Sequence, residues 1–250
     1  MPLLNIERYG DGERILFIHG SGWNTNLWKE QKEYLKSFAE VILIDLPGHG
    51  KSFGKACDSV DEYRKAIEKV ILEHGFKKCF VAGHSLGGAI ALSLALHTPE
   101  LLKGLIIVGS GARLKVLPQI LTGLKKDKEE TIKFITSLGF SPRANIALIN
   151  ENIEEMLKCP QEVIYKDFSS CNNFDVMTDI KKIETPTLII CGLDDKLTPP
   201  KYAHYLHKEI RGSLLVLIED AGHMVMLEKP KEVNRAIENF VKEVQQKNKE

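Results

Sequence analysis

The sequence predicts an α/β protein in which helices cover both faces of a mostly parallel sheet. Short, continuous runs of β-branched and other apolar residues recur along the chain, and segments with helical spacing lie between them. A chain of 250 residues is long enough to bury one substantial core, and its 43% apolar and 27% charged residues are ordinary for a globular domain. These observations indicate one α/β domain with room for an insertion.

The expected strands are the apolar runs, and the expected helices lie between or after them. The strands are predicted at 3–8, 14–18, 41–44, 79–82, 105–108, 187–191 and 214–218. The helices of this core are predicted at 28–38, 60–74, 86–96 and 230–244. In the first helix, the spacing favours Trp28, Tyr34, Leu35 and Phe38 as the buried face.

The alternation of strand and helix breaks between Ser110 and Glu184. This segment has helical patterns at 117–124, 129–138, 144–157 and 161–169 and no convincing strand. Ligands of open α/β sheets bind beyond the carboxyl ends of the strands, where this insertion begins and ends. We therefore expect residues 1–110 and 185–250 to form the core and residues 111–184 to form a helical cap. Helices that only add packing are the alternative.

Ser85 lies in the sequence Gly83-His84-Ser85-Leu86-Gly87, between an expected strand and an Ala/Leu-rich helix. A sharp strand-to-helix turn needs glycine on both sides of the serine, because a Cβ there would collide with the crossing segment. The turn holds the hydroxyl at the positive end of a helix, where a developing anion is stabilised. This pattern predicts a nucleophile elbow.

An acid and a histidine follow in the order that the elbow requires. Asp194 and Asp195 come directly after the strand at 187–191, and His223 follows the strand at 214–218. Because parallel strands end at one edge of a sheet, these side chains are expected beside Ser85. His223 would take the serine proton as general base, and an aspartate would orient the imidazole. The order of the residues alone fits either aspartate to that role.

Two backbone N–H groups are the expected oxyanion hole. One belongs to Leu86, directly after the nucleophile, and the other is expected in the loop His19-Gly20-Ser21-Gly22. In that loop the N–H of Ser21 is the best candidate, since the two glycines let the backbone approach a substrate carbonyl closely.

Composition excludes several other classes of partner. Lys+Arg and Asp+Glu balance at 34 each, so nothing favours nucleic acid, and no apolar stretch is long enough for membrane insertion. The five cysteines are scattered without a C-x-x-C pair, which favours reduced thiols in the cytoplasm. His204 and His207 lack further ligands at metal-binding spacing, so we expect no metal and no cofactor. The expected partner is a small-molecule ester, bound by a monomer or homodimer.

The motifs as a set resemble the α/β-hydrolase superfamily, especially small bacterial carboxylesterases and monoacylglycerol-lipase-like members. The resemblance rests on HGSG (19–22), DLPGHGKS (45–52), GHSLGG (83–88), GLDDKLTPP (192–200) and AGHMVMLEKP (221–230). It implies an eight-stranded, mostly parallel sheet with a helical cap after the sixth strand, although only 18 residues precede His19 and leave little room for the first strand. The family pattern also selects Asp195 as the acid and leaves Asp194 as a turn residue.

The resemblance implies a serine hydrolase that cleaves short- or medium-chain acyl esters or monoglycerides through an acyl-Ser85 intermediate. Relatives with an aspartate nucleophile, the haloalkane dehalogenases and epoxide hydrolases, are excluded by Ser85. Lactonases, carbon–carbon hydrolases and perhydrolases keep the same triad and remain alternatives, as does a ligand sensor with little turnover. The expected substrate pocket comprises Trp23, Leu86, Ile120, Leu124, Phe134, Leu138, Phe174, Leu197 and Met224.

Overall fold

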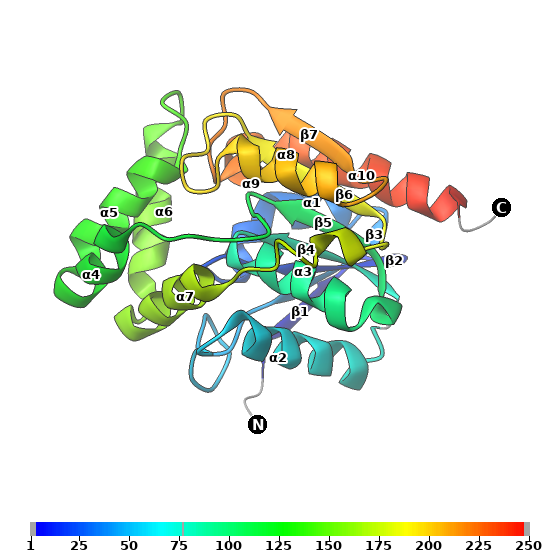
Figure 1. Ribbon diagram of the computed structural model, residues 1–250, viewed down its shortest axis with the longest axis horizontal. Coiled ribbons are helices and arrows are strands. Elements are labelled where there is room, and N and C mark those ends of the chain that lie inside the picture. The colour runs from blue at the N-terminus through cyan, green and yellow to red at the C-terminus, as the bar shows by residue number, and fades with distance from the viewer. Residues whose placement is uncertain (1–3, 77, 248–250) are drawn as a thin grey trace.

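A seven-stranded sheet runs through the centre of the computed structural model, which describes residues 4–76 and 78–247 (Figure 1). The strands are β1 (Ile6–Tyr9), β2 (Glu13–Ile18), β3 (Ala39–Ile44), β4 (Cys79–His84), β5 (Leu102–Val108), β6 (Thr187–Gly192) and β7 (Leu214–Ile218). They lie in the order β1-β3-β2-β4-β5-β6-β7, with β1 antiparallel to β3 and every other neighbouring pair parallel. The predicted α/β fold class is confirmed.

The direction of each crossover decides which face its helix covers. The connection from β2 to β3 runs toward the β1 edge, whereas those into β4, β5 and β7 run the other way. Right-handed crossovers therefore place α1 (Lys29–Leu35) on one face and α2 (Val60–Glu73), α3 (Leu86–His97) and α8 (Pro200–Glu209) on the other. The C-terminal α10 (Pro230–Lys247) packs beside α1, preceded by the short α9 (Val225–Glu228). Single-turn 3₁₀ helices occupy Thr25–Trp28, Pro99–Leu101 and Ile180–Lys182.

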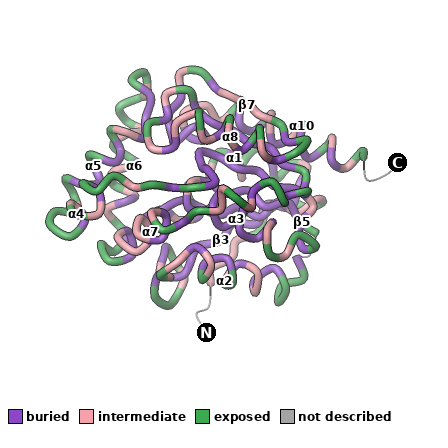
Figure 2. Tube along the Cα trace, viewed as in Figure 1, coloured by how far each residue is buried: buried purple, intermediate pink, exposed green. Residues whose placement is uncertain are grey.

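The centre of the sheet is covered on both faces, which explains its unbroken apolar runs. Every residue of β3, β4 and β6 is buried, as Figure 2 shows for the middle of the molecule. Helix α3 is also buried from Leu86 to Ala95, so its small and apolar residues have no solvent-facing side. The elbow helix is therefore part of the buried core.

Three details differ from the expectations. The described chain has seven strands, and the insertion follows the fifth, because the first strand of the eight-stranded arrangement is absent from the described residues. Strand β1 begins at Ile6, whereas the strand was expected from Leu3, which lies outside the described residues. Tyr34 is 43% exposed, since its hydroxyl donates to Glu238 on the surface at 2.6 Å, whereas Trp28 and Leu35 are buried as expected and Phe38 is partly buried.

The segment between β5 and β6 folds into four helices close to the predicted positions. They are α4 (Pro118–Lys126), α5 (Lys128–Gly139), α6 (Ile146–Lys158) and α7 (Gln161–Asn173). Figure 1 shows them together beside the sheet, with α7 nearest the core, and α7 packs against α3. This four-helix insertion thus lies next to the end of the sheet where β4 leads into α3.

Candidate active site

The turn between β4 and α3 holds Ser85 in a conformation that few side chains adopt. Ser85 has φ +52° and ψ −114°, and its N–H donates to the carbonyl of Val108 at 3.0 Å. A Cβ at Gly83 would lie 2.1 Å from the carbonyl oxygen of Gly87, and a Cβ at Gly87 would lie 2.3 Å from that of Ile18. The two glycines are therefore a steric requirement of the turn. Backbone strain of this kind is typical of functional sites.

Asp195 and His223 contact each other beyond the ends of β6 and β7. The Nδ1 of His223 donates to Oδ2 of Asp195 at 2.9 Å, and both residues are buried. The Oδ1 of Asp195 accepts the backbone N–H groups of Leu197 and Thr198, each at 2.8 Å. The neighbouring Asp194 instead accepts the hydroxyl of Ser141 at 2.6 Å. Of the two aspartates, Asp195 is therefore the one placed to orient His223.

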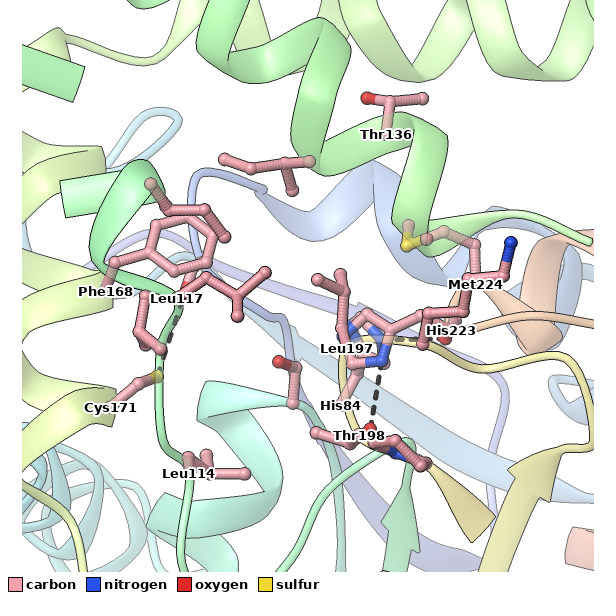
Figure 3. A pocket seen from close by; sticks show the side chains of 18 of the residues that line it. His84, Leu114, Leu117, Thr136, Phe168, Cys171, Leu197, Thr198, His223 and Met224 are labelled. Atoms are coloured by element: carbon pink, nitrogen blue, oxygen red, sulfur yellow. Dashed lines mark hydrogen bonds between the residues drawn. The ribbon is translucent and has the colours of Figure 1, made fainter. Parts of the chain in front are cut away.

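Thr198 shares the Nδ1 proton of His223, a contact that the sequence did not predict. Its hydroxyl donates to Oδ2 of Asp195 at 2.8 Å, and its oxygen lies 3.1 Å from Nδ1 of His223. Because both acceptors face Nδ1, the proton is held there and Nε2 is left free to accept another. Figure 3 shows Thr198 and His223 close together at one side of a cavity. In the tautomer that these contacts favour, Nε2 is therefore the ring nitrogen without a proton.

His84 and Glu228 fix the backbone of the loop that carries His223. The Nε2–H of buried His84 donates to the His223 carbonyl at 3.1 Å, and burial lowers the pKa of His84 well below its ordinary value, so the ring is neutral. The Glu228 carboxylate accepts the N–H of Gly222 at 2.8 Å and that of Ser141 at 2.9 Å. Burial raises the pKa of Glu228. Since Ser141 lies in the four-helix insertion, Glu228 ties that insertion to the histidine loop.

The loop after β2 is fixed by a buried neutral histidine. The Nδ1–H of His19 donates to the carbonyl of Gly20 at 2.8 Å, and Nε2 accepts the N–H of Leu46 at 3.0 Å. Burial lowers the pKa of His19 to about 3. Ser21 lines the same cavity as Ser85, and Leu86 is the fully buried first residue of α3. Of the two residues expected to supply the oxyanion hole, Ser21 thus lines the cavity and Leu86 directly follows Ser85 in the chain.

A cavity of about 220 Å³ connects these groups with the four-helix insertion. Ser85 and His223 both line it, together with residues of α4, α5, α6 and α7. Figure 3 shows Phe168 and Cys171 on the side opposite His223 and Met224. Most of the lining is apolar, which suits the hydrocarbon part of a substrate.

Of the side chains expected in the pocket, Trp23, Ile120, Leu197 and Met224 line this cavity. The structure places Leu86, Leu124, Phe134, Leu138 and Phe174 outside the lining. On α5 the cavity side carries Ile135, Thr136 and Gly139, so Phe134 and Leu138 point along a different face of the helix, and Phe134 is 39% exposed. Leu124 is fully buried, on α4, which packs against α5 and α7. Sequence reasoning missed Leu114, Val116, Phe140, Met156, Phe168 and Tyr202, which also line the cavity.

Within residues 4–76 and 78–247 there is no group of three or more His, Cys, Asp or Glu side chains able to hold a metal ion. No helix in this part of the chain combines the length and apolar character that crossing a bilayer would require.

A mostly parallel sheet with a strained serine at the β4–α3 turn defines a hydrolase of the α/β class. The chain belongs to the alpha/beta hydrolase family, whose model matches residues 15–236. A solved thermophilic esterase is 39% identical, with a TM-score of 0.85, over 98% of this chain and 99% of its own. Sequence relatives include pimeloyl-[acyl-carrier protein] methyl ester esterases. The one from Wigglesworthia glossinidia brevipalpis is 29% identical over 91% of this chain and 93% of its own length. The one from Nitrosomonas europaea is 26% identical over 93% of this chain and 97% of its own length. The chain is therefore a hydrolase with esterases among its relatives.

Proposed function

We propose that this enzyme hydrolyses carboxylic esters through an acyl-Ser85 intermediate, with His223 as general base and Asp195 as its orienting acid. The single observation that carries the proposal is the 2.9 Å contact between Nδ1 of His223 and Asp195, at a cavity that Ser85 also lines. The esterase relatives support the choice of an ester over other substrates.

In the proposed first half-reaction, Nε2 of His223 takes the Ser85 proton as Oγ attacks the ester carbonyl. The negative charge that develops on the carbonyl oxygen is held by the N–H groups of Ser21 and Leu86. The imidazolium then gives its proton to the departing alcohol, which leaves an acyl group on Ser85. In the second half-reaction, His223 activates a water that releases the acid and restores the serine.

We further propose a short- or medium-chain acyl ester or a monoglyceride as the substrate, with residues 111–184 acting as a cap over a core of residues 1–110 and 185–250. Support comes from the mostly apolar cavity of about 220 Å³, which residues of α4 to α7 help to line. A cytoplasmic location is part of the proposal, because all five cysteines are free thiols. The two sequence relatives named above are pimeloyl-[acyl-carrier protein] methyl ester esterases, so methyl esters belong among the substrates to be tested.

The experiment is steady-state hydrolysis of p-nitrophenyl acetate, butyrate and octanoate, compared with fatty acid methyl esters, a lactone and a peptide amide. We expect turnover of the esters by the wild type and a fall of at least about 10³-fold in kcat for Ser85→Ala. Ser137→Ala is the matched control, because Ser137 is an exposed serine of α5. Absence of ester turnover by the wild type, or retention of activity by Ser85→Ala, would contradict the proposal.

A further inference from the structure

A fully buried carboxylate lies outside the proposed triad, on helix α7 of the four-helix insertion. The Oδ2 of Asp167 accepts Nε2–H of His49 at 2.8 Å and the backbone N–H of Gly22 at 2.9 Å. Its Oδ1 accepts the hydroxyl of Tyr63 at 2.6 Å. Asp167, His49 and Tyr63 are each 0% exposed. A buried charge is tolerated only when it is paired and hydrogen-bonded, and both oxygens of Asp167 meet that condition.

His49 completes the pairing as a cation. Its Nδ1 donates to the carbonyl of Pro47 at 3.1 Å, while Nε2 donates to Asp167, so both ring nitrogens carry a proton. Burial alone would lower the pKa of His49, but the Asp167 carboxylate outweighs it and holds that pKa above its ordinary value. The ring of His49 lies 4.9 Å from that of His19, the residue that begins the loop at 19–22. The ion pair is therefore next to that loop.

Helix α7 holds the loop at 19–22 through several of its side chains. Besides the Asp167 bond to the N–H of Gly22, the Sγ of Cys171 lies 3.8 Å from Oγ of Ser21. Gly22 has φ +70°, and a Cβ there would lie 3.2 Å from the side chain of Ile164. The N–H that Asp167 accepts belongs to the peptide directly after Ser21. Because this peptide is planar, the direction of the Gly22 N–H constrains the ψ angle of Ser21.

We propose that Asp167 is a positioning residue that keeps the Ser21 N–H aimed at the oxyanion, and that it makes the oxyanion hole depend on the docking of α7. The inference rests on the proposed function, in which that N–H is an oxyanion donor. If Asp167 merely attached the insertion to the core, its loss would lower stability and leave the chemistry of folded enzyme unchanged. Only the positioning role therefore predicts weaker stabilisation of the transition state in the folded variant.

The test compares wild type with Asp167→Asn, which keeps the size of the side chain but removes the charge and turns an amide toward His49 or Gly22. Kinetics with p-nitrophenyl butyrate are measured well below the melting temperature of each protein. We expect kcat to fall by about 10- to 100-fold with KM changed by less than about 3-fold, since loss of a whole oxyanion donor costs about 10²- to 10³-fold. A trifluoromethyl ketone, whose adduct with the serine carries the oxyanion, should bind more weakly by the same factor as kcat.

Asp175→Asn is the matched control, because Asp175 also lies in the insertion but its carboxylate is 47% exposed and faces Arg113 at 3.8 Å. We expect this control to keep wild-type kcat and ketone affinity. If Asp167→Asn fails to fold, Tyr63→Phe serves instead, since it removes one donor to the carboxylate and keeps the ring. It should lower kcat and ketone affinity in parallel by several-fold.

If the wild type is active and folded Asp167→Asn keeps wild-type kcat and ketone affinity, this inference is overturned and the proposed function is not. When Asp167→Asn does not fold, the same result for Tyr63→Phe overturns this inference. A wild type without ester turnover would overturn the proposed function and this inference with it.

Discussion

His19 is predicted to make the enzyme sensitive to acid. The residue is fully buried, and Nε2 already faces a donor, the N–H of Leu46, at 3.0 Å. A second proton on the ring would have no acceptor there. Burial, helped by the nearby charge of His49, lowers the pKa of His19 from 6.5 to about 3. In the unfolded chain the same ring titrates near its ordinary value, so between these two pKa values the unfolded state binds more protons than the folded state.

The size of the effect follows from that difference. Stability falls as the pH is lowered through 6.5, by about 1.36 kcal/mol for each pH unit until the folded-state pKa is reached. At about pH 4.5, two units below the unfolded value, His19 alone removes about 2.7 kcal/mol of the free energy of unfolding. This is a large share of the ~5–15 kcal/mol that stabilises an ordinary domain.

The assay is urea unfolding of the wild type and His19→Gln at about pH 7.5 and about pH 4.5. The glutamine side chain has an amide oxygen for the N–H of Leu46 and does not titrate. We expect the variant to be less stable at the higher pH but to lose about 2.7 kcal/mol less than the wild type on acidification. Equal losses in both proteins, or an NMR titration of folded His19 near pH 6.5, would refute the reasoning.

The remaining predictions concern the elbow and the acid. Gly87→Ala should abolish ester hydrolysis and lower the melting temperature, because the new Cβ would lie 2.3 Å from a backbone carbonyl, and a stable, active variant would disprove this reading of the turn. Gly139→Ala is the comparison variant, at a glycine that lines the cavity and has room for a Cβ. The nearest atom would be 3.7 Å away, so we expect kcat within about 2-fold and stability raised by up to about 1 kcal/mol in urea unfolding. Asp195→Asn should lower kcat by about 10⁴-fold, as the corresponding change does in serine proteases, while Asp194→Asn should cost less than about 10-fold. Similar losses in the two variants would show that Asp195 does not orient His223.

Much of the core could be predicted from the sequence because buried parallel strands leave a local signature. The β-branched runs at Val41–Ile44 and Thr187–Cys191 lie inside β3 and β6. Both faces of these strands are covered, and no charged residue interrupts either run. The insertion helices were also predicted to within a few residues from their spacing. The number of strands was predicted less well. The expectation of eight strands came from the resemblance, whereas the described chain has seven.

The pocket and the Asp167 contacts could not be predicted, because they depend on how helices are rotated and docked. Phe134 and Ile135 are neighbours in α5, but only Ile135 faces the cavity, and spacing alone does not say which side of a helix meets the core. Asp167 is one acid in an amphipathic helix, and its partners His49 and Gly22 lie 118 and 145 residues away. Such contacts leave no local pattern.

The most direct test of the central claim is to find the covalent intermediate. Wild-type enzyme is mixed with excess p-nitrophenyl butyrate, quenched with acid during turnover and digested, and the mass of the peptide that contains Ser85 is measured. We expect a butyryl group on Ser85 in the wild type, and much slower butyrylation of Ser85 in His223→Ala, because His223 is the proposed base in both half-reactions. A butyryl group on a different residue, or ester turnover by Ser85→Ala at the wild-type rate, would contradict it.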